Sequence, residues 1–261
     1  MKKITILFSF ISLCSLSKAQ DYTIHPELLA GLHAGQGSLK SPEVSLYFRY
    51  VDESPSQDLI SNYFDLTPNH KPIVIAPYIS YIAPTGLTWD TQLEFGFSAQ
   101  ASTTSIQTGI LKRLGKRTEN QLITKIGAFI GRGSAKLDLG QIYQNDLYIQ
   151  INGHKYYENS LDVAYRERQW TFTPQIQFEK VIANRTFLRV NAGYRLPLSY
   201  SVSDVVFTGQ EDRSGERHQE AVSLNQPNIA LRLNGVDQDR KLLNQRGLIV
   251  NIGVGFSIVR K

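Results

Sequence analysis

The most regular feature of the chain is an alternation of apolar and polar residues with a period of two. It is clearest in Leu87–Ala99, which reads LTWDTQLEFGFSA. One face of this segment is aromatic and aliphatic, whereas the other carries Asp90, Gln92 and Glu94. A period of two predicts a β-strand. The segment is also long enough to cross a bilayer as a tilted strand, which takes about 9 to 11 residues.

Seven other segments repeat this pattern, so the sequence predicts eight strands. Pro174 lies on the apolar face of one of them, and because proline removes a donor from the hydrogen-bond ladder, we expect a bulge there. The predicted strands are His25–Gly35, Pro72–Ile82, Leu87–Ala99, Thr104–Leu114, Gln121–Gly133, Gln169–Val181, Thr186–Tyr200 and Gly247–Val259.

The connections between these strands fall into two classes. Short turns are expected at 83–86, 115–120 and 183–185, and long polar loops at 135–168 and 201–245. Short turns follow the second, fourth and sixth strands, and mostly long loops follow the others. The link at 100–103, after the third strand, is the exception because it is short. Eight strands would place both termini in the periplasm and the long loops outside the cell, which is the arrangement typical of outer-membrane barrels.

Two parts of the connections have β character of their own. In the loop 135–168, Asn152-Gly153 stands between β-forming residues and predicts a tight hairpin. Residues 44–51, VSLYFRYV, are also rich in β-forming residues. They would be either an extension of the hairpin that follows the first strand or a separate membrane strand, and the even strand number of bacterial barrels favours the first.

The N-terminus has the three parts of a secretory signal peptide. Met1-Lys2-Lys3 is basic, Ile4–Leu16 is apolar, and Ser17-Lys18-Ala19 supplies small residues for cleavage. We therefore expect residues 1–19 to be a signal peptide and residues 20–261 to be a single domain. Removing the signal would take the formal charge from +5 to +2 and would remove Cys14, the only cysteine. A nearly balanced charge gives no support to nucleic-acid binding.

The alternating segments, such as LTWDTQLEFGFSA and GLIVNIGVGFSI, are combined with a signal peptide and regularly spaced turns. In these features the chain resembles the outer-membrane β-barrel family of small eight-stranded barrels, such as the OmpA transmembrane domain and OmpX. The resemblance implies an all-β, antiparallel, up-and-down transmembrane barrel in the bacterial outer membrane. It implies outer-membrane lipid and the barrel-assembly machinery as partners, with extracellular or periplasmic proteins as further candidates. The chain departs from the family near its end, where Phe256 is followed by Ser-Ile-Val-Arg-Lys.

The interior of an eight-stranded barrel is just wide enough to be filled by side chains. Because buried charges must be paired, we expect an ionic plug, with a narrow polar channel as the alternative. The predicted members of this lumen charge network are Asp90, Glu94, Lys125, Glu179, Arg189 and Arg195. Trp89, Trp170 and Tyr194 are expected on the outer face at the membrane interfaces, where aromatic residues gather.

No pattern in the sequence predicts a cofactor or a metal site, because the five histidines lack the spacing of metal ligands. His154 and His218 fall in long loops that also hold acidic residues, so a loop-based hydrolase is a minor alternative. The leading hypothesis is an outer-membrane barrel that is not an enzyme and acts as a structural, adhesive or binding platform. The second is a narrow pore for small polar solutes. A soluble periplasmic barrel, with Leu248, Val250, Ile252 and Val254 inside and Asn251 and Ser257 in water, is the remaining structural alternative.

Overall fold

A computed structural model of the chain describes residues 26–41, 45–51, 59–65, 70–114, 122–143, 148–157, 160–183, 185–210, 216–226, 229–233, 236–237 and 243–260. The predicted signal peptide lies outside these residues. Fifteen strands are found in this part of the chain. Within the same residues, no helix is long and apolar enough to cross a membrane.

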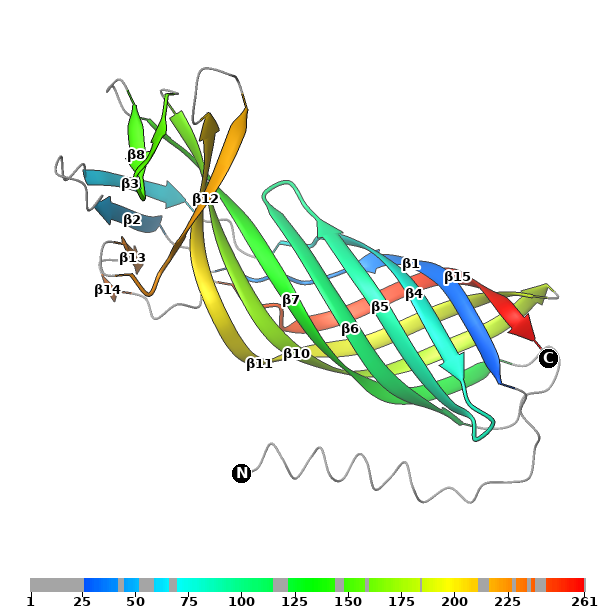
Figure 1. Cartoon of the computed structure of the whole chain (residues 1–261). Coiled ribbons are helices and arrows are strands. Elements are labelled where there is room, and N and C mark those ends of the chain that lie inside the picture. Colours follow the sequence, from blue (N-terminus) through cyan, green and yellow to red (C-terminus); the bar gives the residue numbers. More distant parts are fainter. Residues whose placement is uncertain are drawn as a thin grey trace.

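Eight of the strands form a closed antiparallel ring in which each strand pairs with its neighbours along the chain (Figure 1). The ring closes because the last strand, β15, pairs with the first, β1, over the whole length of β1. We call this assembly the ring. Its members are β1 (Glu27–Gln36), β4 (Ile73–Ile82), β5 (Leu87–Phe97), β6 (Ala101–Leu114), β7 (Ile123–Tyr143), β10 (Ser160–Ala183), β11 (Thr186–Gln210) and β15 (Gly247–Arg260).

The predicted all-β class and the number of strands in the ring are confirmed, and so is the alternation of faces. On β15, Leu248, Ile252 and Phe256 are exposed by 63%, 55% and 55%, whereas Asn251 and Ser257 on the other face are exposed by only 3% and 7%. Polar residues therefore face the inside of the ring and apolar residues face outward. The soluble alternative required the opposite orientation and is wrong.

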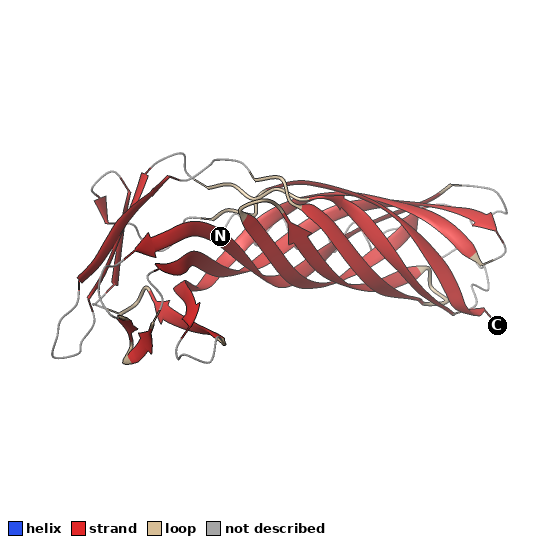
Figure 2. Cartoon of the chain, turned by 90° about the horizontal axis from the view of Figure 1, so that it is seen from above, coloured by secondary structure: helices blue, strands red, loops and turns tan. Residues whose placement is uncertain are grey.

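The seven remaining strands lie at one end of the ring, beside the extended ends of β7, β10 and β11 (Figures 1 and 2). We call this part the head. It contains a four-stranded sheet in the order β14-β13-β2-β3, the hairpin β8-β9, and β12, which pairs with β11. Their bounds are β2 (Ser45–Val51), β3 (Leu59–Asp65), β8 (Ile149–Ile151), β9 (His154–Tyr156), β12 (Arg217–Ser223), β13 (Ile229–Leu233) and β14 (Val236–Asp237).

The head has a hydrophobic core of its own, because one face of its small sheet packs on the extended strands. Phe207 of β11 contacts Phe48 and Tyr50 of β2, with ring centroids 5.6 and 5.8 Å apart, and all three side chains are fully buried. Leu137 of β7 and Tyr165 of β10 belong to the same core. Fully burying a large apolar side chain contributes about 1.5 to 3 kcal/mol, so this cluster is enough to order the head.

The head corrects the predicted loops. Residues 135–143 and 160–168 continue β7 and β10, and 201–210 continue β11, so much of what was expected to be loop is strand. The apolar residues of β7 change faces near Gly133: Ile130 is exposed on the outer surface, whereas Ala135 and Leu137 are buried in the head core. The pairing of β10 with β7 nevertheless continues, from Arg168↔Ser134 to Ser160↔Tyr143.

Two smaller predictions meet different outcomes. Residues 45–51 form β2 of the head and take no place in the ring, as the even strand number favoured. The bulge expected at Pro174 is wrong, because β10 pairs with β7 through Pro174↔Ala128 without a shift. On its other side, β10 keeps the same register with β11 from Phe172↔Leu196 to Gln175↔Gly193, although positions 173 and 174 between them are not paired. Proline has no backbone N–H, so it can stand at this unpaired position without shifting the ladder.

The hairpin predicted at Asn152-Gly153 is confirmed as β8-β9. Both turn residues have positive φ, 49° and 85°, as a tight hairpin turn requires. The two ends of the ring are also distinct. Glu27 at the start of β1 pairs with Arg260 at the end of β15, so the beginning of the first ring strand and the end of the last one lie together, at the end of the ring opposite the head. We call this opposite side the terminal end.

We predict that Phe207→Ala will loosen the head and leave the ring intact. Replacing a buried phenylalanine by alanine typically lowers the free energy of unfolding by about 3 to 5 kcal/mol. The Phe207 side chain packs within the head core, so the loss should fall on the head. Limited proteolysis of the purified protein in detergent should cut the variant faster. The mobility of the unheated protein on a gel should stay that of the folded form.

Tyr63→Ala is the control, since Tyr63 is 70% exposed on β3. Equal rates of cutting for both variants would contradict the assignment of a separate head core.

Candidate functional site

Within the ring, a single arginine joins three strands. Arg189 of β11 donates from Nη1 to the Asp90 Oδ2 of β5 at 2.9 Å, and from Nη2 to the Glu179 Oε1 of β10 at 2.6 Å. It also donates to the Ser80 hydroxyl of β4 at 3.1 Å. The Arg189 side chain is wholly buried, so its charge is balanced by these two carboxylates rather than by water.

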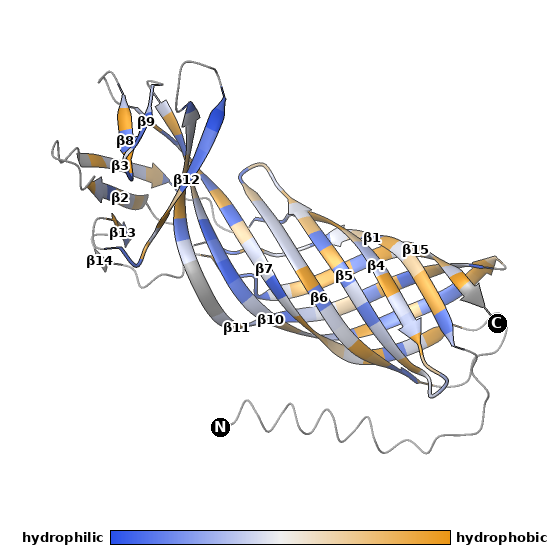
Figure 3. Ribbon diagram, viewed as in Figure 1, coloured by the Kyte–Doolittle hydropathy of each residue, from blue (hydrophilic) through white to orange (hydrophobic). Residues whose placement is uncertain are grey.

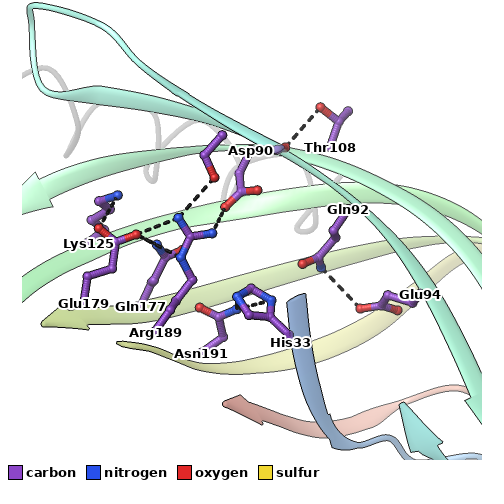
Figure 4. Close-up of polar contacts among 11 residues, drawn as sticks. His33, Asp90, Gln92, Glu94, Thr108, Lys125, Gln177, Glu179, Arg189 and Asn191 are labelled. Carbon is purple, nitrogen blue, oxygen red and sulfur yellow. Dashed lines mark hydrogen bonds and ion pairs between the residues drawn. The ribbon is translucent and has the colours of Figure 1, made fainter. Parts of the chain in front are cut away.

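A lysine completes this cluster (Figure 4). Lys125 of β7 lies 2.8 Å from Glu179 Oε2 and is also fully buried. Glu179 therefore binds both cations, one through each oxygen, and Gln177 donates a further hydrogen bond to it. Two cations and two anions give the cluster no net formal charge. This balance is what makes burial of four charges tolerable, because an unpaired buried charge costs several kcal/mol.

A second ion pair lies between this cluster and the head. Arg195 of β11 binds Glu94 of β5. Ser105 and Gln107 of β6 also donate to Glu94 Oε2, at 2.9 and 2.7 Å. The structure thus places the six predicted lumen residues inside the ring and pairs all of them, in two groups.

An apolar layer lies next to the first cluster, toward the terminal end. Leu29, Tyr78, Ile82 and Phe187 pack together there. The Arg189 guanidinium lies over the Tyr78 ring, 4.0 Å from its centroid. The His33 ring also stacks on Tyr78, with the two ring centroids 4.2 Å apart. A cavity of about 10 Å³ next to the layer has room for about one water.

Glycines on the adjacent strands β1 and β15 make room for the aromatic layer, since Gly31 pairs with Tyr78 and Gly255 pairs with Phe187. A Cβ at Gly255 of β15 would clash with the Tyr78 hydroxyl and the Phe187 ring, and one at Gly31 of β1 would clash with Tyr78. The small residues of GLIVNIGVGFSI thus have a packing role that the alternation alone did not show. Together with the two ion-pair groups, the layer fills the described part of the lumen with side chains.

The predicted interface aromatics lie on the outer surface of the ring. Trp89, Trp170 and Tyr194 are exposed by 57%, 40% and 41%. Two of them have a basic neighbour: the Arg132 guanidinium lies 5.9 Å from the Trp170 ring centroid, and Arg246 lies 6.0 Å from that of Tyr194. Their role at a membrane interface stays a prediction.

The head brings together residues that the sequence keeps far apart. The His154 and His218 rings stack with centroids 5.4 Å apart. Nearby, Asn152 donates to Glu220 Oε1 at 2.8 Å, and the Tyr50 hydroxyl accepts from the Asn152 backbone amide at 2.9 Å. Over the described ranges, no three His, Cys, Asp or Glu side chains gather into a group that could hold a metal.

A second polar group on the head joins β7, β10 and β12. Asp162 accepts from Gln141 Nε2 at 2.8 Å and binds Arg217 Nη2 at 2.6 Å. The hydrogen bond from Gln141 and the charge of Arg217 lower the pKa of the Asp162 carboxyl below its usual value. Sequence reasoning missed these contacts, because β12 lay inside a segment that was expected to be a loop.

Comparison with known proteins adds little beyond the fold. No protein-family model matches the chain, and no curated protein matches it. One similar solved structure is the outer membrane protease OmpT of Escherichia coli, with 7% identity, a TM-score of 0.35, and coverage of 92% of this chain and 100% of that one. Another is a mutant of the porin of Rh. blastica, with 8% identity, a TM-score of 0.11, and coverage of 88% and 100%.

The first of these matches corrects one expectation. The sequence analysis expected a chain that is not an enzyme, and that statement is wrong as a conclusion, because a protein similar to this chain is a protease. At a TM-score of 0.35 the likeness assigns no activity to this chain.

We predict that Glu179→Gln will destabilise the ring strongly. The substitution leaves Lys125 buried without its carboxylate, and breaking a buried pair by removing one partner typically costs about 3 to 5 kcal/mol. On gels of samples heated stepwise in detergent, the variant should lose its folded mobility at a clearly lower temperature.

The double variant Glu179→Gln/Lys125→Met is the matched test, because it removes one charge of each sign and leaves Arg189 with Asp90. It should recover much of the lost stability. A double variant as unstable as the single one would argue against charge balance as the reason.

Proposed function

We propose that this chain is an integral outer-membrane β-barrel whose head, held outside the cell, is a platform for binding or adhesion. The observation that carries the proposal is the apolar outer surface of the ring. Figure 3 shows the alternation of apolar and polar residues along the ring strands. Soluble proteins rarely expose apolar patches larger than a few hundred Å², so lipid is the natural surrounding for this surface.

The height of the apolar surface fits a membrane. On β10 the outward residues from Trp170 through Phe172, Pro174 and Ile176 to Phe178 are apolar, and Lys180 follows them. The stretch from Trp170 to Phe178 rises about 26 Å along the strand, which is about 20 Å along the axis at a tilt of about 40°. With the side chains at its two ends, it approaches the apolar band of about 25 Å that outer-membrane barrels carry.

The head supports the choice of a binding platform. It is ordered by its own core, so it can present a defined surface. Tyr63, Tyr143 and Tyr157 are exposed on it by 70%, 74% and 47%. Tyrosine is enriched at protein interfaces because it offers a large, rigid contact surface with one polar group.

A cysteine-labelling experiment tests the topology, and the single native cysteine, Cys14, lies within the predicted signal peptide. Lys155→Cys places a thiol at the exposed β8-β9 hairpin of the head, and Thr85→Cys places one in the exposed turn between β4 and β5 at the terminal end. A maleimide that does not cross membranes should label the first in intact cells. It should label the second only after the outer membrane is opened.

The reverse order of labelling would place the head in the periplasm and end the platform proposal. Recovery of the protein in the soluble periplasmic extract, without a heat-dependent shift in mobility, would overturn the barrel itself.

We also predict that the purified protein will show no steady conductance in planar bilayers. The ion pairs around Arg189 and the layer of Leu29, Tyr78, Ile82 and Phe187 lie across the lumen and oppose the passage of ions. Phe187→Ala/Tyr78→Ala removes the two aromatic rings of this layer and should raise ion leakage. Steady conductance of the unmodified protein would favour the pore hypothesis.

A further inference from the structure

We propose that the outer surface of β7 and β10 carries a binding site for the phosphate-bearing headgroup of a membrane lipid. The inference rests on the proposed function, since it takes the apolar band to be the membrane-embedded zone. It concerns the head-side edge of that band. There the outward residues change from apolar to basic within one step along each strand.

The register of the two strands puts the basic residues side by side. Trp170 pairs with Arg132, Arg168 with Ser134, and Arg166 with Lys136. Four basic side chains therefore lie on one outward patch, directly above Ile130 and Phe172 of the band. We call these four residues, Arg132, Lys136, Arg166 and Arg168, the basic patch.

Neighbouring contacts hold parts of the patch in place. The Arg166 guanidinium binds Asp204 Oδ2 of β11 at 2.8 Å, and Arg168 lies 3.9 Å from the same oxygen. Arg132 lies against the Trp170 ring. Asp204 offsets part of the positive charge of the patch, and Asp162 interacts with Lys136. The four cations still leave the patch net positive, so it is complementary to a phosphate group.

Hydroxyl groups complete the surroundings. On β6, Thr104 pairs with Ser134 and Ser102 pairs with Lys136, so both lie beside the patch. Hydroxyls and arginines together suit a headgroup that carries both sugar and phosphate oxygens. Trp170 is 40% exposed at the same level, where an indole anchors at the membrane surface.

The patch gathers more cations than the other walls of the ring do. At the head-side ends of β4 and β15, single basic residues, Lys71 and Arg246, lie just beyond the exposed Ile73 and Leu248. A uniform attraction to anionic lipid needs no such clustering. A site for one headgroup does, because several donors must converge on one phosphate.

The experiment is native mass spectrometry of the full-length protein in a neutral detergent with added lipid A, which is a phosphorylated glycolipid. Arg132→Gln/Lys136→Gln removes two charges of the patch and leaves the ion pair of Arg166 with Asp204 in place. Since each basic residue near an anionic surface contributes about 1 kcal/mol, the affinity should fall about 10- to 30-fold. Lys112→Gln/Lys180→Gln, at the opposite edge of the band, is the matched control and should bind as the unmodified protein does.

Two further probes separate the sources of the phosphate. Dephosphorylated lipid A should bind much more weakly, and inorganic phosphate at the same concentration should not displace the intact lipid. Equal losses for both double variants, or equal binding of the dephosphorylated lipid, would overturn the site. Displacement by inorganic phosphate would reduce it to a simple anion site. The topology test above is independent of all these outcomes, because it requires only the barrel and its orientation.

Discussion

The ring depends on one constraint above all: four charges inside it must cancel without water. Arg189 meets this constraint by binding Asp90 and Glu179 at once, and Lys125 supplies the second positive charge. These residues come from β11, β5, β10 and β7, so their pairing ties one side of the ring to the other. Such a cluster adds little net stability by itself, because desolvation offsets the attraction. Its effect is on specificity, since any shift of register would leave a buried charge alone.

The same strands that hold the charges also build the head. β7, β10 and β11 extend well beyond their neighbours, and their extended ends carry Leu137, Tyr165 and Phe207 into the head core. β1, β4, β5 and β15 stop at the edge of the apolar band. One wall of the ring is therefore continuous with the head, and the head needs no separate linker to be held at a fixed position. A surface held this way is suited to binding, because little conformational freedom is lost when a partner docks.

The sequence predicts the ring well and the head poorly, and the reason is physical. Within the ring, an apolar outer surface and a polar lumen impose a strict alternation, as in Leu87–Phe97, so the strands can be predicted directly from the sequence. In the head the difficulty is length: β2 also alternates, with Phe48 and Tyr50 buried, but β8, β9 and β14 span only two or three residues, too few to be predicted as strands. The lumen residues could be named because Asp90, Lys125 and Arg189 fall on inward positions. Their individual partners could not, because pairing depends on which strands face each other across the lumen.

The basic patch follows from the same asymmetry. A strand that stops at the edge of the apolar band ends there in a turn. β7 and β10 instead continue past this edge and present outward side chains at every second position on both sides of it. Only a continuous wall can place Ile130 and Arg132, or Phe172 and Trp170, one step apart across the boundary. An amphipathic ligand with an apolar part and a charged headgroup can contact both the apolar band and the basic patch, whereas a soluble anion would contact only the basic patch. The extended wall therefore accounts for both the position of the head and the place where a lipid headgroup would be held.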